Sequence, residues 1–252
     1  MSGRSRDAFL ARFAGLFGTD RAPRVEDGNF VLLENHAEAT TQAQTNESFS
    51  VKWRRYDQSD EKSRLYEMQK RWYLSLYGFE SETALAAFLK DRAVILDAGC
   101  GLGYKAAWFA ELAPEALVVG VDYSEAARQA AHSYRQLPNL FFMQGDIASL
   151  PFRDGSVSYV SCDQVIMHTQ DPDATFAELT RLTDPDDGQF ACYFYAKKAL
   201  PRELLDDHFR RHCVEMSNEQ LWDMSEQLAE LGASRRTCRR RRRCKFDKSL
   251  SG

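Results

Sequence analysis

Five short apolar runs, separated by connections long enough for a helix, dominate the chain from Val94 onward. They are Val94–Leu96, Leu117–Val121, Leu140–Met143, Val157–Cys162 and Phe190–Tyr195. Apolar runs of this length that alternate with helical segments are typical of βαβ units, whose right-handed crossovers place the strands parallel. The pattern therefore predicts a doubly wound α/β fold, a mainly parallel sheet with helices on both faces.

A glycine-rich turn, DAGCGLG over residues 97–103, follows the first apolar run. Glycines at alternate positions let a backbone turn sharply and approach a ligand where a Cβ would clash. The dinucleotide-binding pattern G-x-G-x-x-G/A requires a third small residue, and Tyr104 stands in that place. Asp97 would repel a phosphate and attract a cation. The turn therefore favours a cationic cofactor over a pyrophosphate.

Acidic residues also end the next two runs. Asp122 lies 19 residues after Gly103, where a carboxylate can accept hydrogen bonds from both hydroxyls of a ribose, and Tyr123 can cover an adenine ring. Asp146 can accept a hydrogen bond from an adenine amino group while Ile147 packs against the ring. Because ligands of such sheets bind beyond the carboxyl ends of the strands, these residues are expected to meet around one ligand.

Together these residues resemble the class I S-adenosylmethionine-dependent methyltransferase family, of the small-molecule type, from about Val94 to Tyr195. The resemblance implies a Rossmann-like methyltransferase fold and S-adenosylmethionine as cofactor, with the glycine turn at its methionine portion. The stretch Gln44–Tyr56 resembles the lead-in of some members, which would lie over the cofactor pocket. The cofactor-binding residues expected on this basis are Asp97, Gly99, Cys100, Gly101, Gly103, Asp122, Tyr123, Asp146, Ile147 and Asp163.

His168 is the candidate catalytic residue, because it follows the fourth run at the rim where an acceptor would face the cofactor. A histidine can accept a proton near neutral pH, although a rim histidine that packs against a loop is the alternative. Three aromatic residues, Trp53, Tyr56 and Trp72, have the spacing of core residues and are not assigned to the site. No D/N-P-P-Y box or Pro-Cys dipeptide follows the fourth run, which disfavours methylation of nucleic-acid bases.

The resemblance thus predicts an enzyme that transfers a methyl group to a small-molecule acceptor by in-line displacement, largely through positioning. Two alternatives stay open. One is a cofactor-binding but non-catalytic or truncated methyltransferase-like protein. The other is an NAD-dependent oxidoreductase, which Asp97 and Tyr104 oppose.

The composition indicates a protein that folds by burial alone, since 44% of its residues are hydrophobic and 28% are charged. Its six cysteines form no C-x-x-C pair, which argues against a disulfide framework or a zinc site, so we expect reduced thiols, a cytoplasmic location and no metal. The apolar stretch Ala8–Phe17 falls short of the ~20 residues of a membrane span, and no membrane association is expected.

The charge is uneven along the chain. Residues 235–252 carry nine Lys and Arg against one acid, whereas the rest of the chain is strongly acidic within a formal net charge of -4. An acidic body argues against a nucleic-acid-binding face on the folded domain. The basic segment is expected to be a disordered tail.

Helical spacing between Glu61 and Leu89, interrupted at Gly78, predicts two helices ahead of the sheet. We expect a helical N-terminal extension and pocket lead-in over 1–60, a methyltransferase domain over 61–234, and the tail over 235–252. The part up to about Asn46 is expected to be an appendage with a turn at 26–29. Family members usually complete the sheet with two more strands, and no apolar run for them follows Leu231, so these C-terminal strands are expected to be missing.

Overall fold

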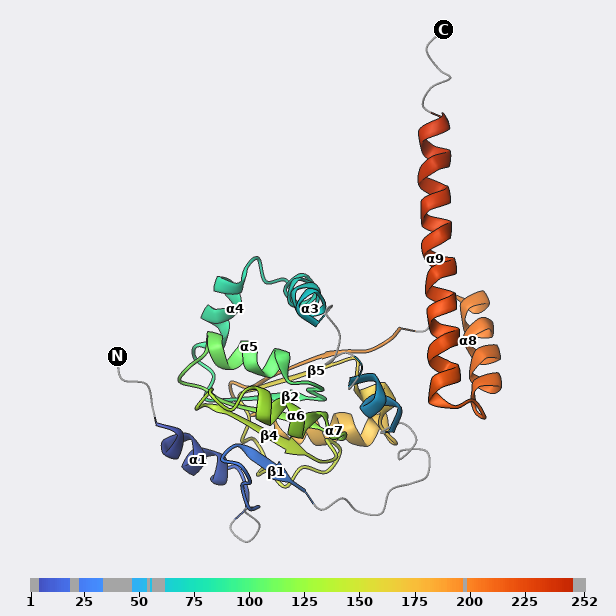
Figure 1. Ribbon diagram of the computed structural model, residues 1–252. Helices are drawn as coiled ribbons and strands as arrows, with labels where there is room; N and C mark the ends of the chain where they lie inside the picture. Colours follow the sequence, from blue (N-terminus) through green and yellow to red (C-terminus); the bar gives the residue numbers. More distant parts are fainter. Residues whose placement is uncertain are drawn as a thin grey trace. The chain divides into compact units, whose positions relative to one another are not determined.

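The parallel sheet predicted from the apolar runs forms the centre of residues 1–195 in a computed structural model (Figure 1). Its six strands lie in the order β1-β4-β3-β2-β5-β6, and all neighbouring pairs are parallel. The strands are β1 (Phe30–Leu32), β2 (Val94–Ala98), β3 (Leu117–Asp122), β4 (Leu140–Gln144), β5 (Tyr159–Asp163) and β6 (Gln189–Tyr193). The structure describes residues 5–18, 23–33, 47–53, 55, 62–196 and 199–246.

Helices cover both faces of this sheet, as the predicted doubly wound fold requires. One face packs against α3 (Lys62–Tyr77), α4 (Glu82–Leu89), α5 (Tyr104–Leu112) and α6 (Ala126–Ser133). The other face packs against α1 (Arg6–Ala14) and α7 (Pro172–Leu182), and a short 3-10 helix, η1 (Ile166–His168), follows β5. The two helices expected between residues 61 and 89 are α3 and α4, and Gly78 separates them with a positive φ of 73°.

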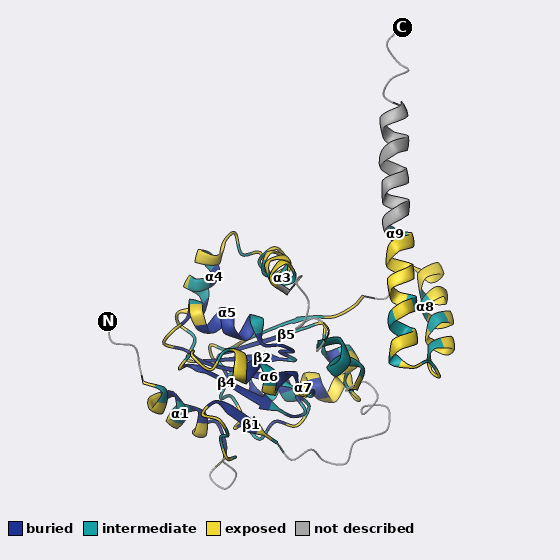
Figure 2. Cartoon of the chain, in the orientation of Figure 1, coloured by how far each residue is buried: buried dark blue, intermediate teal, exposed yellow. Residues whose placement is uncertain are grey.

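Strand β2 shows why the sheet is buried on both sides. Its alternate side chains point to opposite faces, so Leu96 lies in the hydrophobic cluster beneath α1 and α7 while Ile95 lies in the cluster beneath α3 to α6. All five of its residues are buried, and Figure 2 shows the buried strands between the two helical layers. A near-continuous apolar run is the pattern expected of a parallel strand in this position.

The N-terminal residues are part of the core, and the prediction that they form an appendage is wrong. Phe9 and Phe13 of α1 are fully buried, and Phe13 stacks on Phe141 of β4 at 4.8 Å between ring centroids. Arg6 donates hydrogen bonds to two backbone carbonyls of the body, those of Arg135 and of Leu137, the latter at 2.9 Å. After the predicted turn, β1 adds a parallel edge strand beside β4. Burial of these aromatic side chains holds the segment on the sheet.

Residues 196–252 form a second compact unit, separate from residues 1–195. It contains α8 (Leu200–Cys213) and α9 (Asn218–Phe246), so the predicted domain of 61–234 spans parts of both units. The basic segment from residue 235 was expected to be disordered, yet α9 continues through Phe246. Arginine is a strong helix former, which favours this extension. Residues 247–252 lie outside the described residues, and among those described no strand follows β6.

Candidate active site

A cavity of about 640 Å³ opens at the carboxyl ends of β2, β3, β4 and β5. From β2 the chain adds β3 and β4 on one side, and it then returns to place β5 on the other side of β2. The crevice at such a switch point between β2 and β5 is where ligands of doubly wound sheets bind. Side chains of α3 and of the helical segment 47–53 complete the wall. The cavity is large enough for a cofactor-sized ligand.

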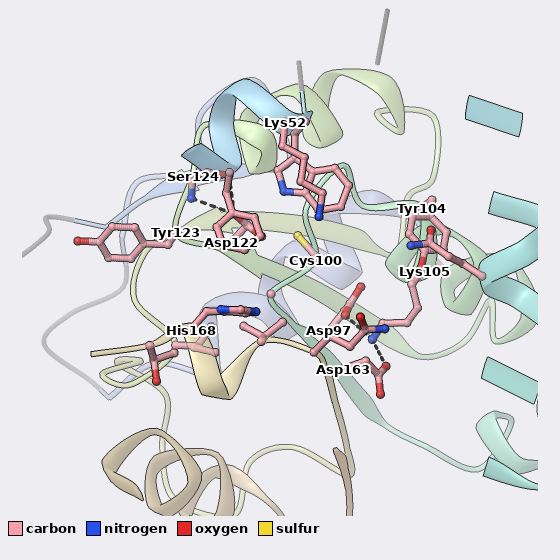
Figure 3. A pocket seen from close by; sticks show the side chains of 18 of the residues that line it. Lys52, Asp97, Cys100, Tyr104, Lys105, Asp122, Tyr123, Ser124, Asp163 and His168 are labelled. Atoms are coloured by element: carbon pink, nitrogen blue, oxygen red, sulfur yellow. Dashed lines mark hydrogen bonds and ion pairs between the residues drawn. The ribbon is translucent and has the colours of Figure 1, made fainter. Parts of the chain in front are cut away.

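Most of the predicted cofactor residues line this one cavity. Figure 3 shows the labelled members Asp97, Cys100, Asp122, Tyr123 and Asp163 around it, with His168 on the same pocket. The predicted residues that line it are Asp97, Gly99, Cys100, Asp122, Tyr123, Asp146, Ile147, Asp163 and His168. Gly101 and Gly103 belong to the same turn but do not line the cavity.

The glycine turn adopts the left-handed backbone that its composition predicts. Gly99, Gly101 and Gly103 have φ values of 79°, 52° and 75°, which residues with a Cβ rarely adopt. Gly103 begins α5, and a Cβ there would lie 2.6 Å from the ring of Phe142, so its role is close packing of the helix on the sheet. A Cβ at Gly101 would lie 2.7 Å from the indole of Trp53. The segment 47–53 therefore packs directly against the turn.

Asp122 is held rigidly at the end of β3. Its Oδ2 accepts a hydrogen bond from the backbone N–H of Gly101 at 2.7 Å, which ties the strand end to the glycine turn. Its Oδ1 accepts from the backbone N–H and the hydroxyl of Ser124 at 2.9 and 2.6 Å. Burial raises the pKa of Asp122, and these hydrogen bonds oppose that rise. Because a carboxylate oxygen has two lone pairs, Oδ2 retains capacity for a ligand hydroxyl.

The loop after β4 supplies the third predicted acid. Asp146 Oδ1 accepts a hydrogen bond from the backbone N–H of Ala148 at 2.9 Å, which closes a tight turn and fixes the side chain at the cavity wall. Ile147 beside it is 4% exposed and presents an apolar surface to the same cavity. In Figure 3 Tyr123 lies beyond Asp122, at the far side of the pocket from Lys105. An apolar surface beside hydrogen-bond acceptors suits a heteroaromatic ring.

A buried ionic cluster occupies the other end of the cavity, where Asp97 and Asp163 meet Lys105 of α5 (Figure 3). Lys105 Nζ lies 3.0 Å from Asp97 Oδ1 and 2.5 Å from Asp163 Oδ2, and it donates a hydrogen bond to Ser161 Oγ at 3.0 Å. Burial opposes the charge on Lys105, but Asp163 and Asp97 outweigh it and raise its pKa well above the ordinary value. Burial raises the pKa of Asp97, which Lys105 counteracts.

Tyrosine hydroxyls extend this cluster into the core. Tyr77 donates a hydrogen bond to Asp163, and the hydroxyls of Tyr73 and Tyr159 lie 2.5 Å apart. Burial raises the pKa of Tyr73 and of Tyr159, so both phenols remain protonated at neutral pH and one hydroxyl donates a hydrogen bond to the other. Asp97 Oδ2 is buried with no hydrogen-bond partner among the described residues. The cluster thus leaves a buried acceptor for a cationic group.

Cys100 is buried in the turn, and burial raises the pKa of its thiol well above the ordinary value. A protonated, buried thiol is a poor nucleophile, which agrees with its expected place as a small residue of the turn. Among the described residues, no group of three or more His, Cys, Asp or Glu could hold a metal ion, and no helix is long and apolar enough to cross a membrane.

The loop after β5 carries His168 at the exposed rim. The His168 ring lies edge-to-face with Phe49 at 5.4 Å and with Tyr195 at 6.0 Å between ring centroids. Gln164 just before this loop has a φ of 60°, and its Oε1 accepts a hydrogen bond from the Tyr195 hydroxyl at 3.1 Å. A left-handed backbone at a residue other than glycine costs about 1–3 kcal/mol and is concentrated at functional sites. The strained loop thus presents His168 to the cavity.

Five of the lining residues that the sequence did not assign to the site are notable. Trp53 and Trp72 are pocket residues despite their core-like spacing, whereas Tyr56 lies outside the described residues. Lys52 and Gln69 join them, and Gln69 Oε1 is buried without a hydrogen-bond partner among the described residues. The fifth, Lys105, had one sequence signal, a lone lysine in the otherwise apolar stretch YKAAWFA.

Comparisons with known proteins agree with this geometry. Residues 96–192 match the family model described as a methyltransferase domain. An uncharacterized methyltransferase of Schizosaccharomyces pombe is 35% identical over 119 residues, which cover 44% of this chain and 42% of that protein. A Mycolicibacterium smegmatis protein named as a probable S-adenosylmethionine-dependent methyltransferase is 38% identical over 91 residues, 36% of this chain and 34% of that one.

A trans-aconitate 2-methyltransferase of Deinococcus radiodurans is 46% identical over 68 residues, 26% of each chain. The chain therefore spans less than half the length of these curated relatives. The matched residues hold the glycine turn and the acids at the carboxyl ends of β2, β3 and β5, and the parallel sheet confirms the predicted fold class. Residues 96–192 of this chain are thus similar to the methyltransferase domain of S-adenosylmethionine-dependent methyltransferases.

Proposed function

We propose that this chain transfers the methyl group of S-adenosylmethionine to a small-molecule acceptor. One observation carries the proposal: the glycine turn and the acids at the carboxyl ends of β2, β3 and β4 converge on a single cavity at the switch point of the sheet. The glycine turn and these acids lie within the segment that matches the methyltransferase domain.

The residues present fit the cofactor. Asp97 has a buried oxygen without a hydrogen-bond partner among the described residues, which suits the methionine ammonium. Asp122 has a free lone pair at a fixed position, which suits a ribose hydroxyl, and Asp146 with Ile147 suits the adenine. An acidic pocket also favours a ligand that carries an ammonium and a sulfonium.

Bound there, S-adenosylmethionine supplies a methyl carbon that a nucleophile can attack in line. The chain contributes position rather than a covalent intermediate, because rigidly held partners such as Asp122 fix the orientation of what they bind. The aromatic side chains of Phe49, Trp53 and Trp72 line the part of the cavity where the acceptor would bind, and they would exclude water from it. His168 at the rim would accept the proton that a hydroxyl or amine acceptor releases.

A small-molecule acceptor is supported by the cavity, whose lining of aromatic residues suits a ligand that enters it whole. The Deinococcus radiodurans relative is named for action on trans-aconitate, a small molecule. The acidic composition of the chain before residue 235 does not favour a nucleic-acid acceptor. We also keep the cytoplasmic location as a prediction.

The test is S-adenosylhomocysteine formation from labelled S-adenosylmethionine, with the small-molecule fraction of a cell extract as the source of acceptors. We expect product with the wild-type chain and with the exposed-site control Asp91→Ala, and none with Asp122→Ala. Cofactor binding without methyl consumption by any extract would favour the non-catalytic alternative. The transferred label then identifies the acceptor by mass spectrometry.

A further inference from the structure

The wall of the cavity contains a second lysine besides Lys105. Lys52 lines the cavity, and its Nζ lies 5.3 Å from the ring centroid of Phe49 and 4.9 Å from that of Trp53. In Figure 3 Lys52 extends from the segment 47–53 into the pocket, whereas Lys105 enters from α5 beside Asp97. The two lysines thus serve different parts of the cavity.

No carboxylate among the described residues pairs with Lys52, in contrast to Lys105 with its two. Burial lowers the pKa of Lys52, and no charged neighbour among the described residues offsets that effect. A partly buried ammonium without a counter-ion costs free energy unless a ligand supplies the negative charge. The ring contacts offset part of that cost but do not neutralise the charge.

The surroundings of Lys52 indicate the body of such a ligand. Phe49, Trp53, Trp72 and Tyr195 line the same cavity, and aromatic walls favour flat apolar molecules. One ammonium balances one negative charge, whereas a phosphate usually recruits an arginine fork or several backbone donors. A single carboxylate is therefore the better match.

We propose that the methyl acceptor is a planar, apolar molecule with one carboxylate, and that this carboxylate pairs with Lys52. The proposal rests on the proposed methyl-transfer function and adds the chemical class of the acceptor. Lys52 anchors the acceptor and takes no part in bond formation. The cofactor's own carboxylate is the competing partner, and the experiment separates the two.

The experiment is calorimetric titration of the full chain, first with S-adenosylhomocysteine and then, at saturation, with two matched pairs of probes. The pairs are indole-3-acetate with indole-3-acetamide, and cinnamate with cinnamamide. We expect at least one carboxylate to bind about 10- to 100-fold more tightly than its amide, the usual effect of a charge-assisted hydrogen bond. Lys52→Met should abolish this preference, and Lys52→Arg should retain it.

The control Lys90→Met removes an exposed lysine outside the cavity, and it should leave the binding of S-adenosylhomocysteine and of the carboxylate probes unchanged. Absence of S-adenosylhomocysteine binding would contradict the proposed function itself. With that binding intact, equal affinity for acid and amide, or no binding of any probe, would overturn the assignment of Lys52. Weaker S-adenosylhomocysteine binding by Lys52→Met would overturn it as well, because Lys52 would then hold the cofactor's carboxylate.

Discussion

Replacement of Lys105 by Met should destabilise the protein strongly, because the methionine leaves two carboxyl groups together without their counter-ion. Lys105 is 8% exposed and contacts Asp97 at 3.0 Å and Asp163 at 2.5 Å. Removal of one partner from a buried ion pair costs about 3–5 kcal/mol. For a chain of this size that corresponds to a decrease of ~6–20 °C in Tm.

The loss of stability in Lys105→Met should also depend on pH. Lys105 lowers the pKa of Asp97 against the effect of burial, so in Lys105→Met the pKa of folded Asp97 rises further above its unfolded value. The folded variant then binds a proton that the unfolded chain releases, and its free energy of unfolding falls as the pH rises through that pKa. The decrease in the free energy of unfolding of Lys105→Met relative to wild type should therefore be smaller at about pH 5 than at about pH 8.

Urea denaturation followed by circular dichroism at both pH values measures this effect, with Lys90→Met as the control for loss of an exposed lysine. A Lys105→Met deficit below about 1 kcal/mol, or one that does not change with pH, would refute the argument that Lys105 is the counter-ion of the cluster.

Three further outcomes follow from packing and backbone geometry. Phe13→Ala should lower the free energy of unfolding by about 3–5 kcal/mol in a urea titration, and a loss below about 1 kcal/mol would contradict the burial of α1. Gly101→Ala should weaken S-adenosylhomocysteine binding in calorimetry, because the added Cβ meets the indole of Trp53. The control Gly28→Ala has a φ of 81° and no described atom within 4 Å of the added Cβ, so it should lower stability alone, by about 1–2 kcal/mol. Tyr73→Phe should cost about 1 kcal/mol of stability through its lost contact with Tyr159, and an unchanged midpoint would contradict that contact.

The sheet and the turn were predictable because their signals are local. A buried parallel strand is a short apolar run in the sequence, so β2, β3 and β4 lie at the predicted positions. Closely spaced glycines indicate a sharp turn by their composition alone. The acids that end these strands then meet for a topological reason, since the carboxyl ends of parallel strands share one edge.

The remaining features depend on contacts between distant segments. The burial of Phe9 and Phe13 depends on sheet residues such as Phe141, more than a hundred residues along the chain, and no local pattern encodes it. Lysine is rarely buried, so the sequence alone predicts that Lys105 is a surface residue. Its burial depends on the ion pairs with Asp97 and Asp163, which form only in the tertiary fold. Trp53 has the spacing of a core residue, and its contact with Gly101 exists in the tertiary fold alone.

The account depends above all on cofactor binding, and titration of the full chain with S-adenosylhomocysteine in a calorimeter tests it most directly. We expect binding that Asp122→Ala weakens by at least about 10-fold while the exposed-site control Asp91→Ala leaves it unchanged, with circular dichroism to verify folding. Absence of binding by the folded wild-type chain, or equal binding by the Asp122→Ala variant, would contradict the assignment of this cavity.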